Sequence, residues 1–288
     1  MLVRCDILAA EDIADFVSGM LAVRVSCGWE EQSLPGRVTR FVIHAPDALF
    51  IQKLTAELQA LHPSLDVAVS NVEEQDWQHA WREYFTPVAC GRFLVLPPWR
   101  VQDTPLDGLL PIIIEPRSAF GTGHHASTAL CLEAISELYQ AGRIVAGMRF
   151  LDLGTGSGIL GIACCRLGLS GIGVDTDPLA IENALENRDR NACPEFTLSV
   201  GSLEHVVDRH FDVALANILA RPLQELAPDL TRALRNSGCL VLSGILAAQA
   251  DEVEAAYARE GFSTARRKQS GEWMALIWDG VMSSLPAA

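Results

Sequence analysis

Hydrophobic and polar positions recur along residues 101–288 in two regular ways. Short apolar runs of strand length are separated by longer stretches in which apolar residues return every three or four positions, as on one face of a helix. The predicted strands are 150–153, 171–174, 196–200, 211–216, 238–243 and 273–278, and the predicted helices are 126–139, 159–167, 178–191, 221–235 and 246–260. Strands that alternate with helices in this way predict an α/β fold with a doubly wound, mainly parallel sheet.

Residues 1–70 follow a different order. The predicted strands are 2–8, 22–29, 37–44 and 65–70, and the predicted helices are 11–20 and 49–61. Leu34-Pro-Gly36 predicts a turn between the two middle strands. This βαββαβ order predicts a small, ferredoxin-like α+β domain.

An acidic and aromatic stretch lies between these two regions. Trp77, Trp81 and Phe85 are four residues apart, which places them on one face of a predicted helix. An aromatic stripe at this spacing is typical of packing. The predicted organisation is therefore a small domain over 1–70, a helical and aromatic linker over 71–100, and a larger domain over 101–288.

The composition is that of a globular protein, with 49% hydrophobic and 20% charged residues among 288. No apolar run reaches membrane-spanning length, and the first residues lack the layout of a signal peptide. The eight cysteines include adjacent Cys164 and Cys165 but no Cys-x-x-Cys pair. We interpret them as small core residues in a reducing compartment and expect a cytoplasmic protein without a structural metal.

The formal net charge of −14 bears on the partner. Proteins that hold phosphate backbones do so with clustered Lys and Arg, so DNA or RNA is not expected as a direct substrate. A small molecule or a basic protein fits better, because opposite charge speeds encounter. A charge that only keeps the protein in solution explains the composition equally well.

The most informative motif is Asp152-Leu-Gly-Thr-Gly-Ser-Gly158, between the predicted strand 150–153 and the predicted helix 159–167. Glycines in such a turn let the backbone approach a ligand closely. Asp175 ends the next predicted strand, about 20 residues after Gly154, where an open α/β sheet places a carboxylate for a ribose hydroxyl pair. The motif predicts a nucleoside-cofactor site.

The glycine spacing bears on which nucleoside is bound. A dinucleotide site favours Gly-x-Gly-x-x-Gly with a pyrophosphate at the helix terminus, whereas here the glycines are Gly154, Gly156 and Gly158. Asp152 would repel a pyrophosphate and could accept a hydrogen bond from an ammonium group. The pattern therefore favours S-adenosylmethionine over NAD. A glycine-rich turn that binds nothing is the remaining alternative.

Several separated segments together resemble one family. They are Asp76-Trp77 with Trp81, Pro-Pro-Trp-Arg100, Glu115-Pro116, Ala119-Phe-Gly-Thr-Gly-His-His125, the glycine loop, Asp175-Thr-Asp-Pro178, Ala216-Asn-Ile-Leu-Ala220 and Leu242-Ser-Gly-Ile-Leu246. Through these the chain resembles the bacterial ribosomal protein L-eleven (L11) methyltransferase family over most of its length. The resemblance implies a Rossmann-like class I methyltransferase fold with a small N-terminal substrate-recognition domain.

The resemblance also implies roles for individual residues. Phe120 and Thr122 would pack around the methionine end of S-adenosylmethionine, and the loop from Asp152 to Gly158 would line the same side. Asp175 would hold the ribose, and Asn217 would lie next to the transferable methyl group. The implied substrate is ribosomal protein L11, methylated on lysine side chains and its terminal amine. We expect the protein to act as a monomer.

The chain departs from the family pattern at a few positions. Thr155 stands where the family usually has Cys, which we expect to be tolerated. The family has a proline after the histidine that ends the segment Ala119–His125, whereas this chain has Ala126 there. We expect the hydroxyls of Ser127 and Thr128 to cap the helix that follows. His124 and His125 are adjacent, but no partner with metal-ligand spacing follows, so no metal site is expected.

Other functions remain open at this point. A methyltransferase of the same fold could act on lysines of a different protein, or on a small molecule. A protein that keeps the cofactor fold only as a scaffold would bind S-adenosylmethionine weakly.

Overall fold

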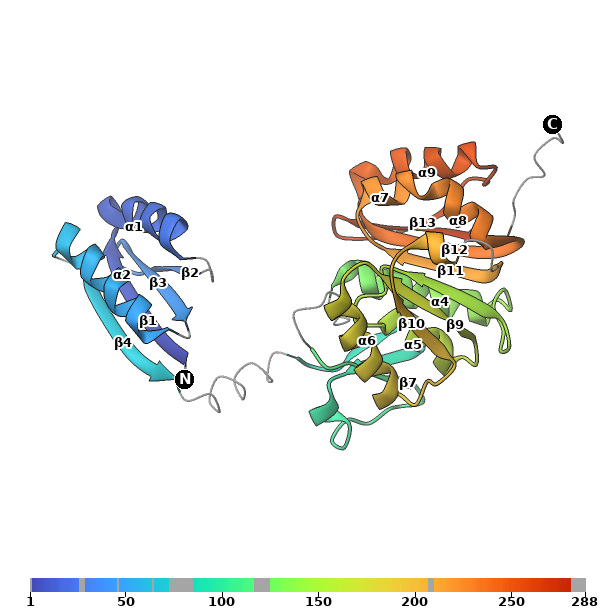
Figure 1. The fold of residues 1–288 in the computed structure, drawn as a ribbon, viewed down its shortest axis with the longest axis horizontal. Helices are drawn as coiled ribbons and strands as arrows, with labels where there is room; N and C mark the ends of the chain where they lie inside the picture. The colour runs from blue at the N-terminus through green and yellow to red at the C-terminus, as the bar shows by residue number, and fades with distance from the viewer. Residues whose placement is uncertain are drawn as a thin grey trace. The chain divides into compact units, whose positions relative to one another are not determined.

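The structure, a computed structural model, describes residues 2–25, 29–45, 47–63, 65–72, 85–116, 125–206 and 210–280. Its internal contacts divide the chain into two compact units, Met1–Tyr84 and Phe85–Ala288, coloured blue to cyan and cyan to red in Figure 1. The predicted aromatic helix across Trp77 and Trp81 lies outside the described residues.

The first unit is one sheet covered by two helices. Its elements are β1 (Leu2–Ala10), α1 (Glu11–Arg24), β2 (Glu30–Leu34), β3 (Val38–Ala45), α2 (Ala48–Leu61) and β4 (Asp66–Val72). Among the described residues the strands pair antiparallel in the order β2-β3-β1-β4. Every second residue of β1, from Val3 to Ala9, is buried in one core with α1 and α2, so both helices cover the same face. The predicted ferredoxin-like topology is confirmed.

The predicted strand 22–29 is wrong, because α1 continues to Arg24 and β2 begins only at Glu30. Val17, Leu21 and Val25 are buried and spaced four apart, so the apolar face of α1 extends beyond the predicted end of the helix. The observed strand β2 has the sequence Glu-Glu-Gln-Ser-Leu and lies at the edge of the sheet. Edge strands carry charges more often than apolar alternation, so the pattern did not reveal it.

The second unit contains a larger sheet. Its strands are β8 (Arg149–Leu153), β9 (Ser170–Asp175), β10 (Phe196–Val200), β11 (Phe211–Asn217), β12 (Leu234–Leu246), β13 (Arg266–Ser270) and β14 (Trp273–Asp279). The order among the described residues is β10-β9-β8-β11-β12-β14-β13. The first five are parallel, and β14 is antiparallel to both of its neighbours. The predicted doubly wound, mainly parallel sheet is confirmed.

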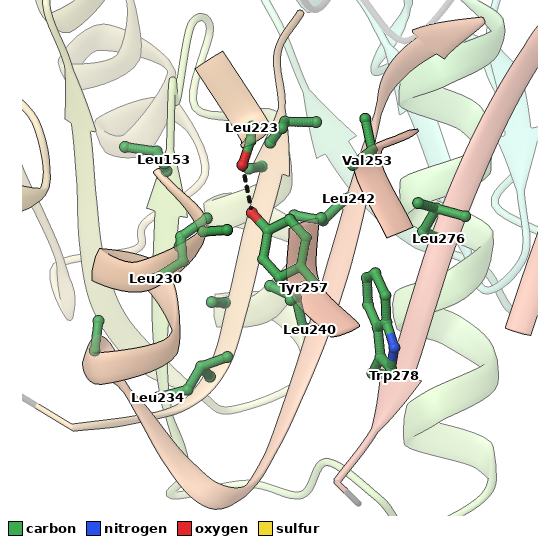
Figure 2. Close-up of a cluster of buried hydrophobic side chains, with 14 of the residues drawn as sticks. Leu153, Leu223, Leu230, Leu234, Leu240, Leu242, Val253, Tyr257, Leu276 and Trp278 are labelled. Atoms are coloured by element: carbon green, nitrogen blue, oxygen red, sulfur yellow. Dashed lines mark hydrogen bonds between the residues drawn. The ribbon is translucent and has the colours of Figure 1, made fainter. Parts of the chain in front are cut away.

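Helices cover both faces of this sheet. They are α4 (Ala126–Gln140), α5 (Ile159–Arg166), α6 (Pro178–Arg190), α7 (Ala220–Glu225), α8 (Ala227–Ala233) and α9 (Ala250–Arg259), with 3-10 turns η1 (Pro98–Arg100), η2 (Leu203–His205) and η4 (Ala247–Gln249). One core joins α4 and α5 to one face, and a second joins α7, α8 and α9 to the other. Figure 2 shows the second core, where the Tyr257 hydroxyl donates to the Leu223 carbonyl at 3.0 Å. This bond ties α9 to α7.

Two details differ from the sequence predictions. The predicted helix 221–235 is two helices, and Pro228 occupies the first turn of the second. The edge strand β13 was not predicted, because its sequence Arg-Arg-Lys-Gln-Ser has no apolar alternation. A smaller sheet of β5 (Val88–Cys90), β6 (Phe93–Leu96) and β7 (Leu110–Ile113) precedes α4. Within the described ranges, no helix is both long and apolar enough to cross a bilayer.

Candidate functional site

A cavity of about 580 Å³ lies at the carboxyl ends of the parallel strands of the larger sheet. The described residues that line it are Leu153, Gly154, Thr155, Gly156, Ile159, Leu160, Asp175, Thr176, Gly201, Ser202, Asn217, Ile218, Leu219, Pro222, Leu226, Gly244 and Trp273. Carboxyl ends of parallel strands meet at one edge of a sheet, which is where open α/β folds bind ligands. The structure thus brings four of the predicted residues, Gly154, Gly156, Asp175 and Asn217, around one cavity.

The glycine loop owes its shape to backbone conformations that only glycine adopts readily. Gly154, Gly156 and Gly158 have φ of +68°, +55° and +81°. A Cβ on Gly154 would also collide with the Ile218 side chain, which follows β11. Gly158 is the N-cap of α5 and packs near Ala184 and Phe196, and it is not among the described residues of the cavity wall. The first two glycines therefore face the cavity, whereas Gly158 shapes the turn into the helix.

Asp152 lies beneath this loop and is 1% exposed. Its Oδ2 accepts hydrogen bonds from the Thr155 hydroxyl at 2.7 Å and the Gly161 amide at 3.0 Å. Burial raises the pKa of Asp152 to about 6, against the lowering effect of the two hydrogen bonds. Asp152 is not among the described residues of the cavity wall, and its hydrogen bonds stabilise the conformation of the loop. Direct contact between Asp152 and an ammonium group of a ligand stays a prediction. Thr155, expected only to be tolerated, supplies one of the two donors.

Asp175 ends β9 on the cavity wall. Its Oδ2 accepts from the Gly156 amide at 2.9 Å and its Oδ1 from the Asp177 amide at 3.0 Å. A carboxylate has about four lone-pair sites, so two backbone amides leave acceptor capacity for hydroxyl groups of a ligand. The two amides also fix the orientation of the carboxylate relative to the loop.

Asn217 ends β11, two strands away from β9 in the sheet order, or about 10 Å at the usual strand spacing. Its Nδ2 donates to the Thr128 hydroxyl at 3.1 Å. Thr128 is fully buried in the first turn of α4, so this bond fixes the plane of the amide. The Asn217 Oδ1 is buried and has no hydrogen-bond partner among the described residues. An unpaired buried acceptor is costly in a folded protein and often marks a functional group.

The start of α4 differs from the prediction. The N-cap is His125, whose Nδ1 accepts from the Ser127 amide at 3.3 Å, whereas Ser127 and Thr128 are buried within the first turn. The prediction that their hydroxyls cap the helix is wrong. The His125 ring also packs edge-on against Trp273 of the cavity wall, with ring centroids 4.4 Å apart.

Two predicted cofactor residues, Phe120 and Thr122, lie outside the described residues, as does His124. Among the residues that the structure describes, no cluster of three or more His, Cys, Asp or Glu side chains is suited to a metal ion.

The wall combines apolar side chains with few polar groups. Among its described residues there is no Lys or Arg, and Asp175 is the acidic one. Such a wall suits a ligand with hydroxyls and positive or no charge, and it is poorly suited to a pyrophosphate. Three of the wall residues, Ile218, Leu219 and Gly244, fall within segments that resemble the family, but the sequence predicted no site role for any wall residue that follows β11 or lies on β12 or β14. The wall residues in these places are Ile218, Leu219, Pro222, Leu226, Gly244 and Trp273.

Comparison with known proteins gives a consistent result. A family model for ribosomal protein L11 methyltransferase matches residues 27–279. A protein of that name from Symbiobacterium thermophilum is 38% identical over 72% of this chain and 66% of its own length. Another, from Pseudomonas aeruginosa, is 43% identical over 66% of this chain and 63% of its own. This chain therefore spans about two thirds of the length of these curated relatives. The solved structure of a ribosomal protein L11 methylase from Lactobacillus delbrueckii subsp. bulgaricus is similar with a TM-score of 0.61 and 30% identity, covering 67% of this chain and 97% of that one.

Proposed function

Because the chain belongs to the ribosomal protein L11 methyltransferase family and has its class I methyltransferase fold, we propose that it methylates amines of ribosomal protein L11 with S-adenosylmethionine as methyl donor. The observation that carries the proposal is the Asn217 Oδ1. It is a buried acceptor without a partner among the described residues, and it belongs to a residue that lines the same cavity as Asp175.

The wall fits this donor better than it fits a dinucleotide. Asp175 offers oriented carboxylate oxygens to a ribose, and the absence of Lys and Arg among the described wall residues disfavours a pyrophosphate. Gly154 and Gly156 leave room for a ligand to approach the loop backbone. The bound donor would supply an electrophilic methyl group on a sulfonium. We propose Gly154, Gly156 and Asp175 as the residues that hold it, with Asp152 and Gly158 shaping the loop.

Asn217 would orient the amine that receives the methyl group. A lysine amine reacts only when neutral, although its ordinary pKa is near 10.4. The apolar wall, with Leu153, Ile159 and Trp273 among its residues, disfavours the ammonium form and so lowers that pKa. The Asn217 Oδ1 can accept a hydrogen from the neutral amine, directing its lone pair, without the negative charge that would hold the amine protonated. Orientation of this kind supplies much of the rate enhancement of a displacement.

The first unit would recognise the protein substrate. We base this on the family and on the acidic charge of the chain, which favours a basic partner. Removal of residues 1–84 should abolish methylation of L11 while the second unit still binds S-adenosylmethionine, and equal loss of both would contradict this division. A cytoplasmic location would follow from a ribosomal substrate.

The test is incubation of the purified protein with S-adenosylmethionine and unmethylated L11, followed by mass spectrometry of L11. The expected result is a mass gain in steps of one methylene, which should disappear with Asn217→Ala. Tight binding of S-adenosylmethionine without any gain on L11 would move the target to a different protein. Failure to bind S-adenosylmethionine would contradict the whole proposal.

A further inference from the structure

Two asparagines of α6 and the asparagine at its C-cap form a buried row next to the glycine loop. Asn183, Asn187 and Asn191 are spaced four apart, so they lie on one face of the helix and its C-cap. Their exposed fractions are 2%, 0% and 3%. We call this row the asparagine ladder. Amide side chains are rarely buried without hydrogen bonds, so the partners of the ladder show what it holds.

Asn191 replaces a strand neighbour at the edge of β7. Its Oδ1 accepts from the Ile113 amide at 2.8 Å, and its Nδ2 donates to the Ile113 carbonyl at 2.7 Å. Its Nδ2 also donates to the Asn187 carbonyl at 2.8 Å. On the opposite edge, the Ile114 amide donates to the Leu96 carbonyl at 3.1 Å. Asn191 therefore anchors the end of β7 to α6 and, among the described residues, makes no hydrogen bond to the glycine loop.

Asn187 joins two segments that are distant in sequence. Its Oδ1 accepts from the Glu115 amide at 2.9 Å, just beyond β7. Its Nδ2 donates to the Ser157 carbonyl at 2.9 Å, inside the glycine loop, and to the Asn183 Oδ1 at 3.3 Å. The buried Asn187 side chain thus hydrogen-bonds both to the glycine loop and to the residues just after β7, which are distant from each other in sequence.

A second contact holds the same segment on α6. The Glu115 carboxylate forms an ion pair with Arg190 at 3.0 Å, and Arg190 also lies 3.6 Å from Glu186. This pair is partly exposed and contributes little by itself. The Glu115 amide, by contrast, is held by the fully buried Asn187.

We propose that Asn187 is a positioning residue for the cofactor, which keeps the glycine loop in its binding conformation before the cofactor arrives. This inference rests on the proposed function, since it assumes that the loop binds S-adenosylmethionine. A loop with glycines at 154, 156 and 158 has wide conformational freedom when nothing restrains it. Binding must then order the loop, and this cost weakens affinity unless the protein has ordered it already. The Asn187 amide restrains the loop from behind, without touching the cavity.

Asn191 provides a matched control. Asn187 and Asn191 each make three side-chain hydrogen bonds from buried positions on the same helical face, but only Asn187 bonds to the loop. We would compare Asn187→Ala with Asn191→Ala by thermal unfolding and by calorimetric titration with S-adenosylmethionine, at a temperature well below both unfolding midpoints. Both variants should lose similar stability. Asn187→Ala should raise the Kd by roughly tenfold and Asn191→Ala by less than about twofold, because loss of a buried hydrogen-bond partner costs on the order of 1–3 kcal/mol.

Hydrogen exchange of the ligand-free proteins separates this inference from the proposed function. Amides of residues 154–161 should exchange faster in Asn187→Ala than in wild type and remain unchanged in Asn191→Ala. If Asn187→Ala does not fold, Asn187→Ser gives the same comparison, because a serine hydroxyl at this position is too short to replace the amide. Equal Kd values for the two variants, or unchanged loop exchange in the Asn187 variant, would overturn the inference. Wild-type protein that does not bind S-adenosylmethionine would overturn the proposed function and the inference together.

Discussion

The two ends of the cavity differ in how their polar groups are satisfied. At the end of β9, both oxygens of Asp175 accept backbone amides, one from the glycine loop and one from Asp177. At the end of β11, Asn217 is held on its donor side by Thr128, and its acceptor oxygen has no partner among the described residues. The Asp175 carboxylate is oriented by two backbone amides, whereas the Asn217 amide is oriented by one side-chain hydroxyl and keeps an acceptor without a partner among the described residues.

This difference indicates a division of labour within one sheet edge. A carboxylate oriented by two amides suits tight, static binding, since little reorganisation is needed when a ligand arrives. A fixed amide with an unused acceptor suits a group whose interaction forms during the reaction, because only interactions stronger in the transition state raise kcat. We therefore expect changes at Asp175 to alter affinity and changes at Asn217 to alter rate.

The largest effect is expected for Asn217→Ala. Loss of the orienting acceptor should lower kcat for L11 methylation by roughly 100- to 1,000-fold, the range seen when an oriented transition-state hydrogen bond is removed. The Kd for S-adenosylmethionine should change by less than about threefold, since the cofactor would be held at the other end. Stopped assays with mass detection and calorimetric titration measure the two quantities. An unchanged kcat would remove Asn217 from its proposed role.

The next effect concerns stability and involves Asp152, the acid that the loop hides from the cavity. Burial raises the pKa of Asp152 to about 6 from its ordinary value of 3.8. Between about pH 4 and pH 6 the folded state therefore binds a proton that the unfolded state has released, and the free energy of unfolding falls as pH rises, by up to about 3 kcal/mol. Below this window the contribution is fully present, and above it the contribution is lost.

Asp152→Asn tests this dependence, because an amide oxygen can still accept from Thr155 and Gly161 but does not titrate. Chemical denaturation at a series of pH values should show the wild type losing stability relative to the variant as pH rises through this window. A constant difference between the two proteins across the window would mean that Asp152 titrates normally.

Asp175→Ala should weaken cofactor binding without an equal effect on rate. Hydrogen bonds to a charged group contribute about 1.5–3 kcal/mol, so we expect the Kd for S-adenosylmethionine to rise by roughly 10- to 100-fold. At saturating cofactor, kcat should remain within about threefold of wild type. Asp177→Ala is the control, because Asp177 caps α6 through the Leu179 amide and is not among the described wall residues. A similar rise in Kd in the control would attribute the effect to helix stability.

The smallest effect is expected for Thr128→Val, which keeps the shape of the side chain and removes the hydroxyl that holds the Asn217 amide. A hydrogen bond of this kind contributes about 1 kcal/mol net, so kcat should fall by roughly fivefold with little change in Kd. Thr231→Val on α8 removes a hydroxyl that, within the described part of the chain, donates only to the Ala227 carbonyl, and it should leave kcat unchanged. Equal activity of the two variants would show that the Asn217 amide needs no such support.

Much of the fold follows from periodicity, because buried parallel strands are apolar and lie between turns. The prediction of 196–200 matches β10, and those of 150–153 and 171–174 fall within β8 and β9. Periodicity fails where burial does not set the sequence, as in the polar edge strands β2 and β13. It is also ambiguous at the end of α1, since the spacing of Val17, Leu21 and Val25 suits a helix, whereas Val23 and Val25 suit a strand as well.

The site follows from sequence only where a local motif carries it. The glycine loop and Asp175 were predicted by spacing within one βαβ unit, and Asn217 by resemblance. The link between Asn217 and Thr128 spans 89 residues, and that between Asn187 and Glu115 spans 72, so neither leaves a local pattern. The sequence also did not predict the burial of Asp152, because an acidic residue at the end of a strand is usually exposed and only the structure shows that the glycine loop covers it.

The division of labour at the sheet edge is tested most directly by measuring the Kd for S-adenosylmethionine and the single-turnover rate in Asp175→Ala, Asn217→Ala and the double variant. The account predicts that the first change acts on Kd, the second on rate, and that their free energies add within about 0.5 kcal/mol in the double variant, as for independent sites. If both single variants instead lose the same parameter, or if the double variant is no worse than either single one, the two ends act as one unit and the account is wrong.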